Sequence, residues 1–408
     1  MTDAPLEVVS RRGHPDFIDL PWDRPLEGWS DGRLVRMAHG LSRHVVRFVR
    51  YDDRVYAIKA TDLGSARREY EMLGRLRAAH LPTVEPVGVV TGAAGHGAAL
   101  ITRYLDFSLP YWYVFGRDDL PAPDSVLRDA AVVLLVRLHL AGVFWGDCSL
   151  SNILFRRDAG ALMAYLVDAE TAEQRPSIGD ALREHDLDLA VENIVGGLLN
   201  LQAEGRVDPE LDVVGLVDRF RSRYDELWQE LTGTDVVDVD ERWRIERRVR
   251  HLNRLGFDVE ELAIETTDEG RRLRITPRVV EEGHHARELQ RHTGLTVQEN
   301  QARRLLSDIA NFGARLGQSE GRTLPEAVVA ARWLAEVYEP IVSAIPESLR
   351  DRLEPAELFH QLLEHRYLVS ARQSREVPNL EALDSLLRTV ITGRPSEQLL
   401  GGADAGDR

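Results

Sequence analysis

The chain has 408 residues, which at roughly 100 to 200 residues per domain predicts two or three domains. Hydrophobic residues make up 43% of the sequence and charged residues 29%, an ordinary balance for a globular protein. The formal net charge of -16 argues against a protein that binds nucleic acid or anionic lipid along its whole length.

The sequence has no pattern typical of a secreted or membrane-spanning protein. Its single cysteine, Cys148, excludes an intrachain disulfide. The first 20 residues contain no apolar core of a signal peptide. The longest apolar run, residues 130–145, is interrupted by Arg137 and His139 and is shorter than the about 20 residues of a membrane span. We therefore expect a cytoplasmic protein with no membrane span.

The first quarter of the chain predicts a compact β-rich lobe. Residues 1–30, rich in Pro, Asp and Trp, are interpreted as an extended N-terminal arm. Alternation and β-branched residues predict five strands, over RLVRMA, HVVRFVRY, RVYAIKA, TVEPVGVV and AALITRYL. A helix over GSARREYEMLGRLRAAH separates the third strand from the fourth. We assign this lobe to residues 31–105.

The remainder of the chain is mainly helical in pattern. Residues 125–142 predict an apolar helix that ends at Gly142, and LSNILFR with ALMAYLVDAE predicts a strand pair around the turn RDAG. From Asp180 onward only VEELAIETTDEGRRLRITPR departs from helix, as a β-hairpin with the turn DEG. The predicted boundaries are 106–205 for a second lobe, 206–393 for a mainly helical C-terminal domain of unknown role and 394–408 for a disordered tail.

Three short motifs contain residues suited to chemistry. VYAIK is a strand that ends on Lys59, GDCSLSN supplies Asp147 and Asn152, and LVDAE is an apolar strand that ends on Asp168. These are the groups that phosphoryl transfer needs. The ammonium neutralises charge on nucleotide phosphates, and the loop aspartate positions the acceptor hydroxyl. The asparagine and the later aspartate offer oxygen ligands of the kind that Mg²⁺ prefers.

Lys59 is also the only lysine of the chain, whose 51 basic residues are otherwise all arginine. Drift in coding composition could leave one lysine at any position. A phosphate site suits a compact point charge, however, whereas a guanidinium is larger and planar. We therefore favour a functional reason for this lysine.

The run LHLAGVFWGDCSLSNIL resembles the LHxxGVxHGDLxxxNIL run of the protein-kinase-like superfamily. The lipopolysaccharide (Kdo-type) kinase branch looks closest. The resemblance implies an α+β bilobal fold with a five-stranded N-lobe sheet and a helical C-lobe, and the use of ATP and Mg²⁺. It implies that Lys59 binds phosphate, that Asp147 is the catalytic-loop base, and that Asn152 and Asp168 are metal ligands.

The same resemblance suggests supporting residues. ITRYLDFSL is similar to the segment that joins the lobes, so the backbone of Arg103, Tyr104 and Leu105 should meet the adenine. Gly40, in MAHGLSRHV, stands in the position of the phosphate-covering loop. In REHDLDLAVENI, either of two aspartates, Asp186 or Asp188, would steady the catalytic loop.

Two glutamates on the helix after Lys59 are candidates to hold its ammonium. Glu69 shares a helix face with Met72, Leu73 and Leu76. Glu71 lies on a weaker face with Gly74 and Arg75. We predict that Glu69 is the partner.

The sequence also departs from the pattern of regulated protein kinases. Trp145, Gly146 and Asp147 replace the usual His-Arg-Asp, and the segment after Asp168 is short. Both features fit small-molecule and lipopolysaccharide kinases better. Glu170 stands where glycine is customary, and it is either a further metal ligand or the start of the next turn.

The resemblance to kinases covers residues 30–205. Beyond it, LTVQENQARRLLSDIANFGA and WLAEVYEPIVSAIP resemble an uncharacterised domain family that follows kinase-like modules in actinobacterial proteins. Two functions stay open. The first is phosphotransfer to a hydroxyl of a small molecule, glycoconjugate or protein. The second is a pseudokinase, a nucleotide-responsive scaffold that binds a protein partner through residues 206–393. The arginine-rich stretch 241–278 could meet nucleic acid, but its interleaved glutamates and the net charge disfavour this partner.

Overall fold

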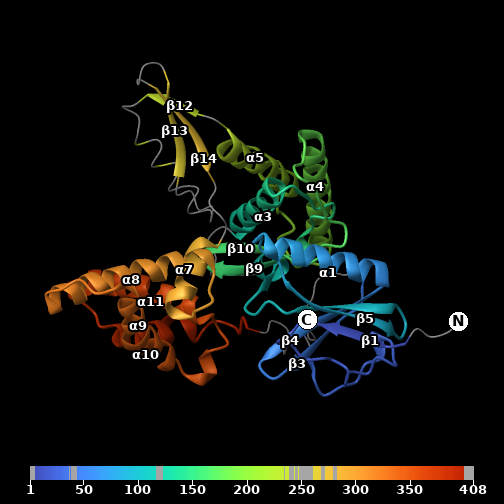
Figure 1. The fold of residues 1–408 in the computed structure, drawn as a ribbon, viewed down its shortest axis with the longest axis horizontal. Coiled ribbons are helices and arrows are strands. Elements are labelled where there is room, and N and C mark those ends of the chain that lie inside the picture. Colours follow the sequence, from blue (N-terminus) through green and yellow to red (C-terminus); the bar gives the residue numbers. More distant parts are fainter. Residues whose placement is uncertain are drawn as a thin grey trace. The chain divides into compact units, whose positions relative to one another are not determined.

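The computed structural model describes residues 5–35, 37, 44–115, 123–233, 235–238, 243, 247, 261–267, 272–278 and 283–398. The chain forms two compact units (Figure 1). The described part of unit 1 comprises residues up to Arg156 together with Met163–Trp228, and unit 2 comprises Arg157–Leu162 and Gln229–Gln398.

Unit 1 begins with a six-stranded antiparallel sheet in the order β1-β5-β6-β4-β3-β2. Helix α1 lies along one face of this sheet (Figure 1), and its N-cap Asp62 accepts a hydrogen bond from the backbone N–H of Ser65 at 3.0 Å. The elements are β1 (Glu7–Ser10), β2 (Leu34–Val35), β3 (Val46–Tyr51), β4 (Arg54–Thr61), α1 (Leu63–Ala78), β5 (Glu85–Ala93) and β6 (Gly97–Arg103).

The opposite face of the sheet is covered by the segment predicted to be an extended arm. Phe17 and Trp22 are buried there, and the ring of Phe17 meets Tyr51 and Tyr56 edge-on, with centroids 5.2 and 5.0 Å apart. An antiparallel sheet can leave one face to solvent, but this face carries apolar side chains, and these aromatic residues cover them. The arm is therefore part of the core, and it also forms β1, a sixth strand that the sequence did not predict.

The rest of unit 1 is mainly helical and surrounds α3, which is buried on nearly every side from Ala130 to Leu138. Helix α5 belongs to this unit as far as Trp228, and its Tyr224 is buried against His139. The division thus follows Trp228, whereas the sequence placed the start of the C-terminal domain at residue 206. The elements are η1 (Leu26–Gly28), β7 (Leu109–Pro110), α2 (Tyr111–Phe115), α3 (Pro123–Leu140), β8 (Val143–Phe144), η2 (Leu150–Asn152), β9 (Ile153–Asp158), β10 (Ala161–Leu166), β11 (Glu173–Gln174), α4 (Asp180–Ala203) and α5 (Val213–Thr232).

Unit 2 contains a three-stranded sheet in the order β12-β14-β13 and a helical core around Trp333, Phe359 and Leu362. The predicted hairpin is confirmed, with the pairing running from Glu261 opposite Arg278 to Thr267 opposite Arg272, although its DEG turn lies outside the described residues. The elements are β12 (Asp235–Asp238), β13 (Glu261–Thr267), β14 (Arg272–Arg278), α7 (His284–Thr293), α8 (Glu299–Glu320), α9 (Glu326–Trp333), η4 (Leu334–Tyr338), α10 (Glu339–Ser343), η5 (Glu347–Leu349), α11 (Pro355–Gln373), α12 (Asn379–Leu386) and η6 (Leu387–Ile391).

The predicted fold class is confirmed as a mixed α and β chain with an N-terminal antiparallel sheet and a helical C-terminal region. Of the predicted tail, residues 394–398 are described and include Glu397, which is only 1% exposed, while residues 399–408 lie outside the described part. Among the described helices, none is both long and apolar enough to cross a bilayer.

Replacement of Phe17 by alanine tests whether the N-terminal segment belongs to the lobe. Phe17→Ala removes a fully buried ring and should lower the free energy of unfolding of unit 1 by about 4 kcal/mol. The control is Ile18→Ala, because Ile18 is 63% exposed and its loss should change stability by less than about 0.5 kcal/mol. Equal effects of the two substitutions in thermal unfolding would contradict the assignment.

Candidate active site

The position of Lys59 follows from the alternation of β4. Tyr56 and Ile58 face the aromatic core on one side of the sheet, so Lys59 projects from the other side. Its strand neighbours in register are Val46 on β3 and Leu100 on β6. The ammonium therefore projects from a central strand that is hydrogen-bonded to a neighbouring strand on each side.

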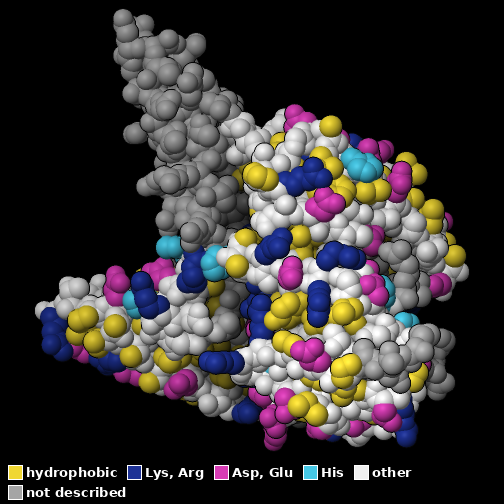
Figure 2. Space-filling model, turned by 45° about the vertical axis from the view of Figure 1, so that its right-hand side comes forward, with side chains coloured by type: hydrophobic (Ala, Val, Ile, Leu, Met, Phe, Trp, Pro, Cys, Tyr) yellow, Lys and Arg dark blue, Asp and Glu magenta, His cyan; other side chains and the backbone are white. Residues whose placement is uncertain are grey.

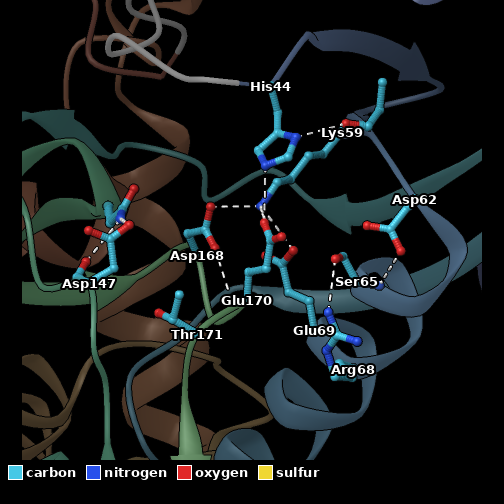
Figure 3. Close-up of polar contacts among 12 residues, drawn as sticks. His44, Lys59, Asp62, Ser65, Arg68, Glu69, Asp147, Asp168, Glu170 and Thr171 are labelled. Carbon is cyan, nitrogen blue, oxygen red and sulfur yellow. Dashed lines mark hydrogen bonds and ion pairs between the residues drawn. The ribbon is translucent and has the colours of Figure 1, made fainter. Parts of the chain in front are cut away.

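Three carboxylates surround this ammonium (Figure 3). The Nζ atom of Lys59 donates to Asp168 Oδ2 at 2.7 Å, to Glu69 Oε2 at 3.0 Å and to Glu170 Oε2 at 3.3 Å. Glu69 is almost fully buried, whereas Glu71 is exposed and pairs with Arg75 at 3.7 Å. Glu69 is thus the glutamate of α1 that holds the lysine.

The charges of this cluster do not balance, because one ammonium serves three carboxylates. Burial acts to lower the pKa of Lys59, but Glu69 and Asp168 outweigh it and raise that pKa above its ordinary value. Burial, reinforced by the charge of Asp168, raises the pKa of Glu69 to about 7 against the opposing effect of the ammonium. The site therefore carries negative charge that a further cation could neutralise.

The donor set suits a hard divalent cation. One oxygen from each of Glu69, Asp168 and Glu170 lies within 4.8 Å of the others. Carboxylate oxygens are the ligands that Mg²⁺ prefers. The predicted ligand Asp168 thus has two acidic neighbours, and Glu170 faces the cluster, although acidic groups of this kind also occur without a metal.

His44 is a neighbour of the cluster that the sequence analysis did not single out. Its Nε2 atom lies 3.1 Å from Glu170 Oε2, and its Nδ1 donates to the carbonyl oxygen of Ala60 at 3.2 Å. Its position at the end of the loop before β3 was the available signal. His44 and Lys59 therefore contact the same carboxylate oxygen of Glu170, and Figure 3 shows the imidazole next to the ammonium.

The side chain of Asp147 is held by two amides. Asn152 Nδ2 donates to Asp147 Oδ2 at 3.1 Å and to the Asp147 carbonyl oxygen at 3.0 Å. Asn193 Nδ2 donates to Asp147 Oδ1 at 3.1 Å. The sequence analysis missed Asn193, although it follows Asp186 by seven residues and so shares its face of α4. Together the two amides fix the direction of the carboxylate.

Asp186 fixes the backbone of the loop that carries Asp147. It is fully buried, and its carboxylate accepts hydrogen bonds from Trp145 N at 2.6 Å, Gly146 N at 2.8 Å and His139 Nε2 at 3.0 Å. Asp188 is exposed and pairs with Arg221 instead. Of the two aspartates left open by the sequence, Asp186 is the one that steadies the loop.

Trp145 ties this loop to the strand end that carries Asp168. Its indole Nε1 donates to the carbonyl oxygen of Asp168 at 3.0 Å, and its own carbonyl accepts from Thr171 Oγ1 at 2.8 Å. Gly146 follows with φ of 76°, and a Cβ there would lie 2.9 Å from the ring of Phe144. Hydrogen bonding and backbone geometry thus account for Trp145 and Gly146 in this loop.

A cavity in unit 1 brings most of the predicted residues together. Its polar end is formed by Lys59, Glu69, Asn152 and Asp168. Its other walls include the predicted lobe-joining residues and apolar side chains: Val46, Phe48, Ala57, Val84, Leu100, Arg103, Tyr104, Leu105, Leu154 and Val167. Asp147 does not line this cavity but accepts a hydrogen bond from Asn152, which does. Gly40 lies outside the described residues.

The comparisons with known proteins agree with this geometry. Residues 52–192 match the model of the Lipopolysaccharide kinase (Kdo/WaaP) family, a range that contains Lys59, Asp147, Asn152 and Asp168. Residues 226–391 match a Domain of unknown function (DUF4032). The resemblance of the chain to this kinase branch, followed by an uncharacterised domain, is confirmed.

A solved structure titled "WaaP in complex with acyl carrier protein" is similar at 18% identity, covering 54% of this chain and 88% of that chain, with a TM-score of 0.31. A score this low carries no argument, so the similarity to kinases rests on the family match. A comparison with curated proteins gave no match.

Substitution of Asp186 should loosen the loop that carries Asp147. Asp186→Ala leaves two backbone N–H groups and His139 without their buried acceptor, and it should lower the free energy of unfolding by about 3 kcal/mol. Thermal unfolding and amide exchange at Trp145 and Gly146 measure the effect. In the control, Asp188→Ala, an exposed pair is lost and the change should stay below about 1 kcal/mol. Equal effects would show that Asp186 is not the loop's support.

Removal of the ammonium should destabilise unit 1 in a pH-dependent way. Lys59→Met leaves three carboxylates facing one another, and the loss of stability should reach about 3 kcal/mol near pH 8. The pKa of Glu69 is already raised above its unfolded value, so stability falls as pH rises and the loss should shrink near about pH 5.5. Arg50→Met, at an exposed position of β3, is the matched control. A loss that does not depend on pH would contradict this electrostatic description.

Proposed function

We propose that this protein is an ATP- and Mg²⁺-dependent phosphotransferase that transfers the γ-phosphate to a hydroxyl of a small molecule, glycoconjugate or protein. The contact of Lys59 with Glu69 and Asp168 carries the proposal. These partners lie 10 and 109 residues away in sequence, and they converge on the single lysine of the chain. Such convergence of an ammonium and metal-type ligands is what phosphate chemistry requires.

Each residue of the cavity has a task in this proposal. The apolar walls and the backbone of residues 103–105 take the adenine, and Lys59 binds the phosphates at the polar end. Asn152 and Asp168 are the groups that would hold Mg²⁺, with Glu170 as a further acidic neighbour. The bound ion would neutralise charge on the phosphates during transfer.

Asp147 receives the acceptor hydroxyl. Its carboxylate is oriented by Asn152 and Asn193, so it can accept a hydrogen bond from the hydroxyl and take its proton. The acceptor oxygen then bonds to the γ-phosphorus while the bond to the bridging oxygen breaks and ADP leaves. Positioning supplies most of the catalysis in this reaction class, which is why the supports of Asp147 matter.

We assign the acceptor to a second pocket, which shares Leu150 and Ser151 with the nucleotide cavity and contains Asn193, the partner of Asp147. Hydroxyl, carboxamide and charged groups line it together with two aromatic rings. Such a lining suits a hydroxyl-rich acceptor better than an acyl chain. The lining residues used in this argument are Tyr111, Trp112, Ser149, Glu192, Asn200, Glu204 and Arg206.

A pseudokinase is the second candidate, and Glu170 is the observation that favours it. Its carboxylate faces Lys59 from the position where glycine is customary, so it competes with phosphate for the ammonium. A nucleic-acid-binding function has less support. On the face shown in Figure 2, basic and acidic side chains are intermixed, and most of the arginine-rich stretch 241–278 lies outside the described residues.

The single lysine gives a direct test. An acyl-phosphate derivative of ATP should acylate Lys59, detected by peptide mapping, and excess Mg·ATP should protect it. Asp147→Asn should keep this labelling but lose at least about a hundredfold of phosphate transfer. Asp53→Asn, at an 89% exposed carboxylate, is the control.

The outcomes separate the candidates. Labelling and protection without turnover in the unmodified protein would favour the pseudokinase. Absence of protected labelling at Lys59 would overturn both nucleotide-dependent functions.

A further inference from the structure

The hairpin of β9 and β10 connects the proposed metal ligands to unit 2. At its open end, β9 begins directly after Asn152 and β10 ends two residues before Asp168, and Val167 N donates to the Asn152 carbonyl oxygen at 3.1 Å. Its closed end, Arg157–Leu162, belongs to unit 2. Strands of this length reach about 20 Å. A displacement at the tip can therefore reach both ligands.

Unit 2 holds the tip through a buried carboxylate. Asp158 is fully buried and accepts hydrogen bonds from Gln301 N at 2.8 Å and Asn300 N at 3.2 Å, in the first turn of α8. Burial raises the pKa of Asp158 to about 7, against the effect of these two donors. An apolar residue would be easier to bury here, so the carboxylate points to a positional role.

An ion pair holds the tip on its other side. The Nε and Nη2 atoms of Arg157 donate to the Glu397 carboxylate at 3.0 to 3.2 Å. The two side chains are 9% and 1% exposed. The two residues lie 240 positions apart. Bidentate geometry of this kind fixes orientation as well as distance.

The turn itself is held in a strained conformation. Ala159 and Gly160 have φ of 51° and 85°, which the tight two-residue hairpin turn requires at both positions. Alanine rarely adopts such a φ. The backbone N–H of Ala159 donates to Glu357 Oε2 at 2.8 Å, and Gln301 Nε2 donates to the Arg157 carbonyl oxygen at 3.1 Å. Unit 2 thus binds the backbone of the tip as well as its side chains.

We propose that the domain of residues 226–391, with the segment through Glu397 that follows it, is a clamp on the tip of the β9–β10 hairpin. Through the two strands, this clamp positions Asn152 and Asp168. Arg157 and Asp158 are then positioning residues rather than groups that touch nucleotide. The link to nucleotide binding rests on the proposed function, whereas the mechanical link along the strands does not.

Amide hydrogen exchange on the full chain tests the clamp. Glu397→Ala should speed exchange about tenfold along β9 and β10, as far as Ile153 and Leu166, because the buried partner of Arg157 is lost. Glu381→Ala removes the exposed partner of Arg375 in the same unit and should leave these strands unchanged. By linkage, Mg·ATP should slow exchange at Asn300 and Gln301 in the unmodified protein.

Exchange that rises only within unit 2, with no change at Ile153 and Leu166, would overturn the proposal whatever the protein binds. Unchanged exchange at Asn300 and Gln301 on saturation with Mg·ATP would overturn its link to the nucleotide. Failure of the unmodified protein to bind Mg·ATP would instead defeat the proposed function, and the exchange comparison would still decide the mechanical link. If Glu397→Ala does not fold, Glu397→Gln keeps the shape and should give the same effect at smaller amplitude.

Discussion

A single buried ammonium shared by three carboxylates is the interaction on which the candidate site of this protein depends. Lys59 contacts a glutamate of α1 and the two acidic residues that follow β10. The two acidic residues after β10 lie more than 100 positions from Lys59 in the sequence. Without the ammonium these carboxylates would repel one another at close range. The ammonium therefore holds the cluster together and leaves an excess of negative charge, which favours a divalent cation.

The contacts that hold the loop of Asp147 form a second layer around that cluster. Asp186 holds the loop backbone and Trp145 joins the loop to Asp168, while two amides aim the Asp147 carboxylate. The same hydrogen bonds also satisfy polar groups that are buried in the fold. Stability and the geometry of the site therefore require the same residues at these positions. The β9–β10 hairpin extends this argument to unit 2, because its tip belongs to that unit while its open end lies next to the proposed metal ligands.

The sequence predicted the parts of the site that depend on local patterns. Strand alternation placed Lys59, and helical spacing chose Glu69 over Glu71. It could not choose between Asp186 and Asp188, since the choice depends on which face of α4 meets the loop. Asn193 and His44 were missed because their partners lie far away in sequence. The cover supplied by residues 17–29 and the strand β1 were missed for the same reason, as both depend on a sheet formed later in the chain.

A crystal structure with Mg²⁺ and a non-hydrolysable ATP analogue would test the central claim most directly. The account predicts a phosphate oxygen within hydrogen-bond distance of Lys59 Nζ, Glu69 still in contact with the ammonium, and the metal bound to Asn152 and Asp168. A saturated crystal in which Lys59 contacts only its carboxylates, with the nucleotide elsewhere or absent, would contradict it.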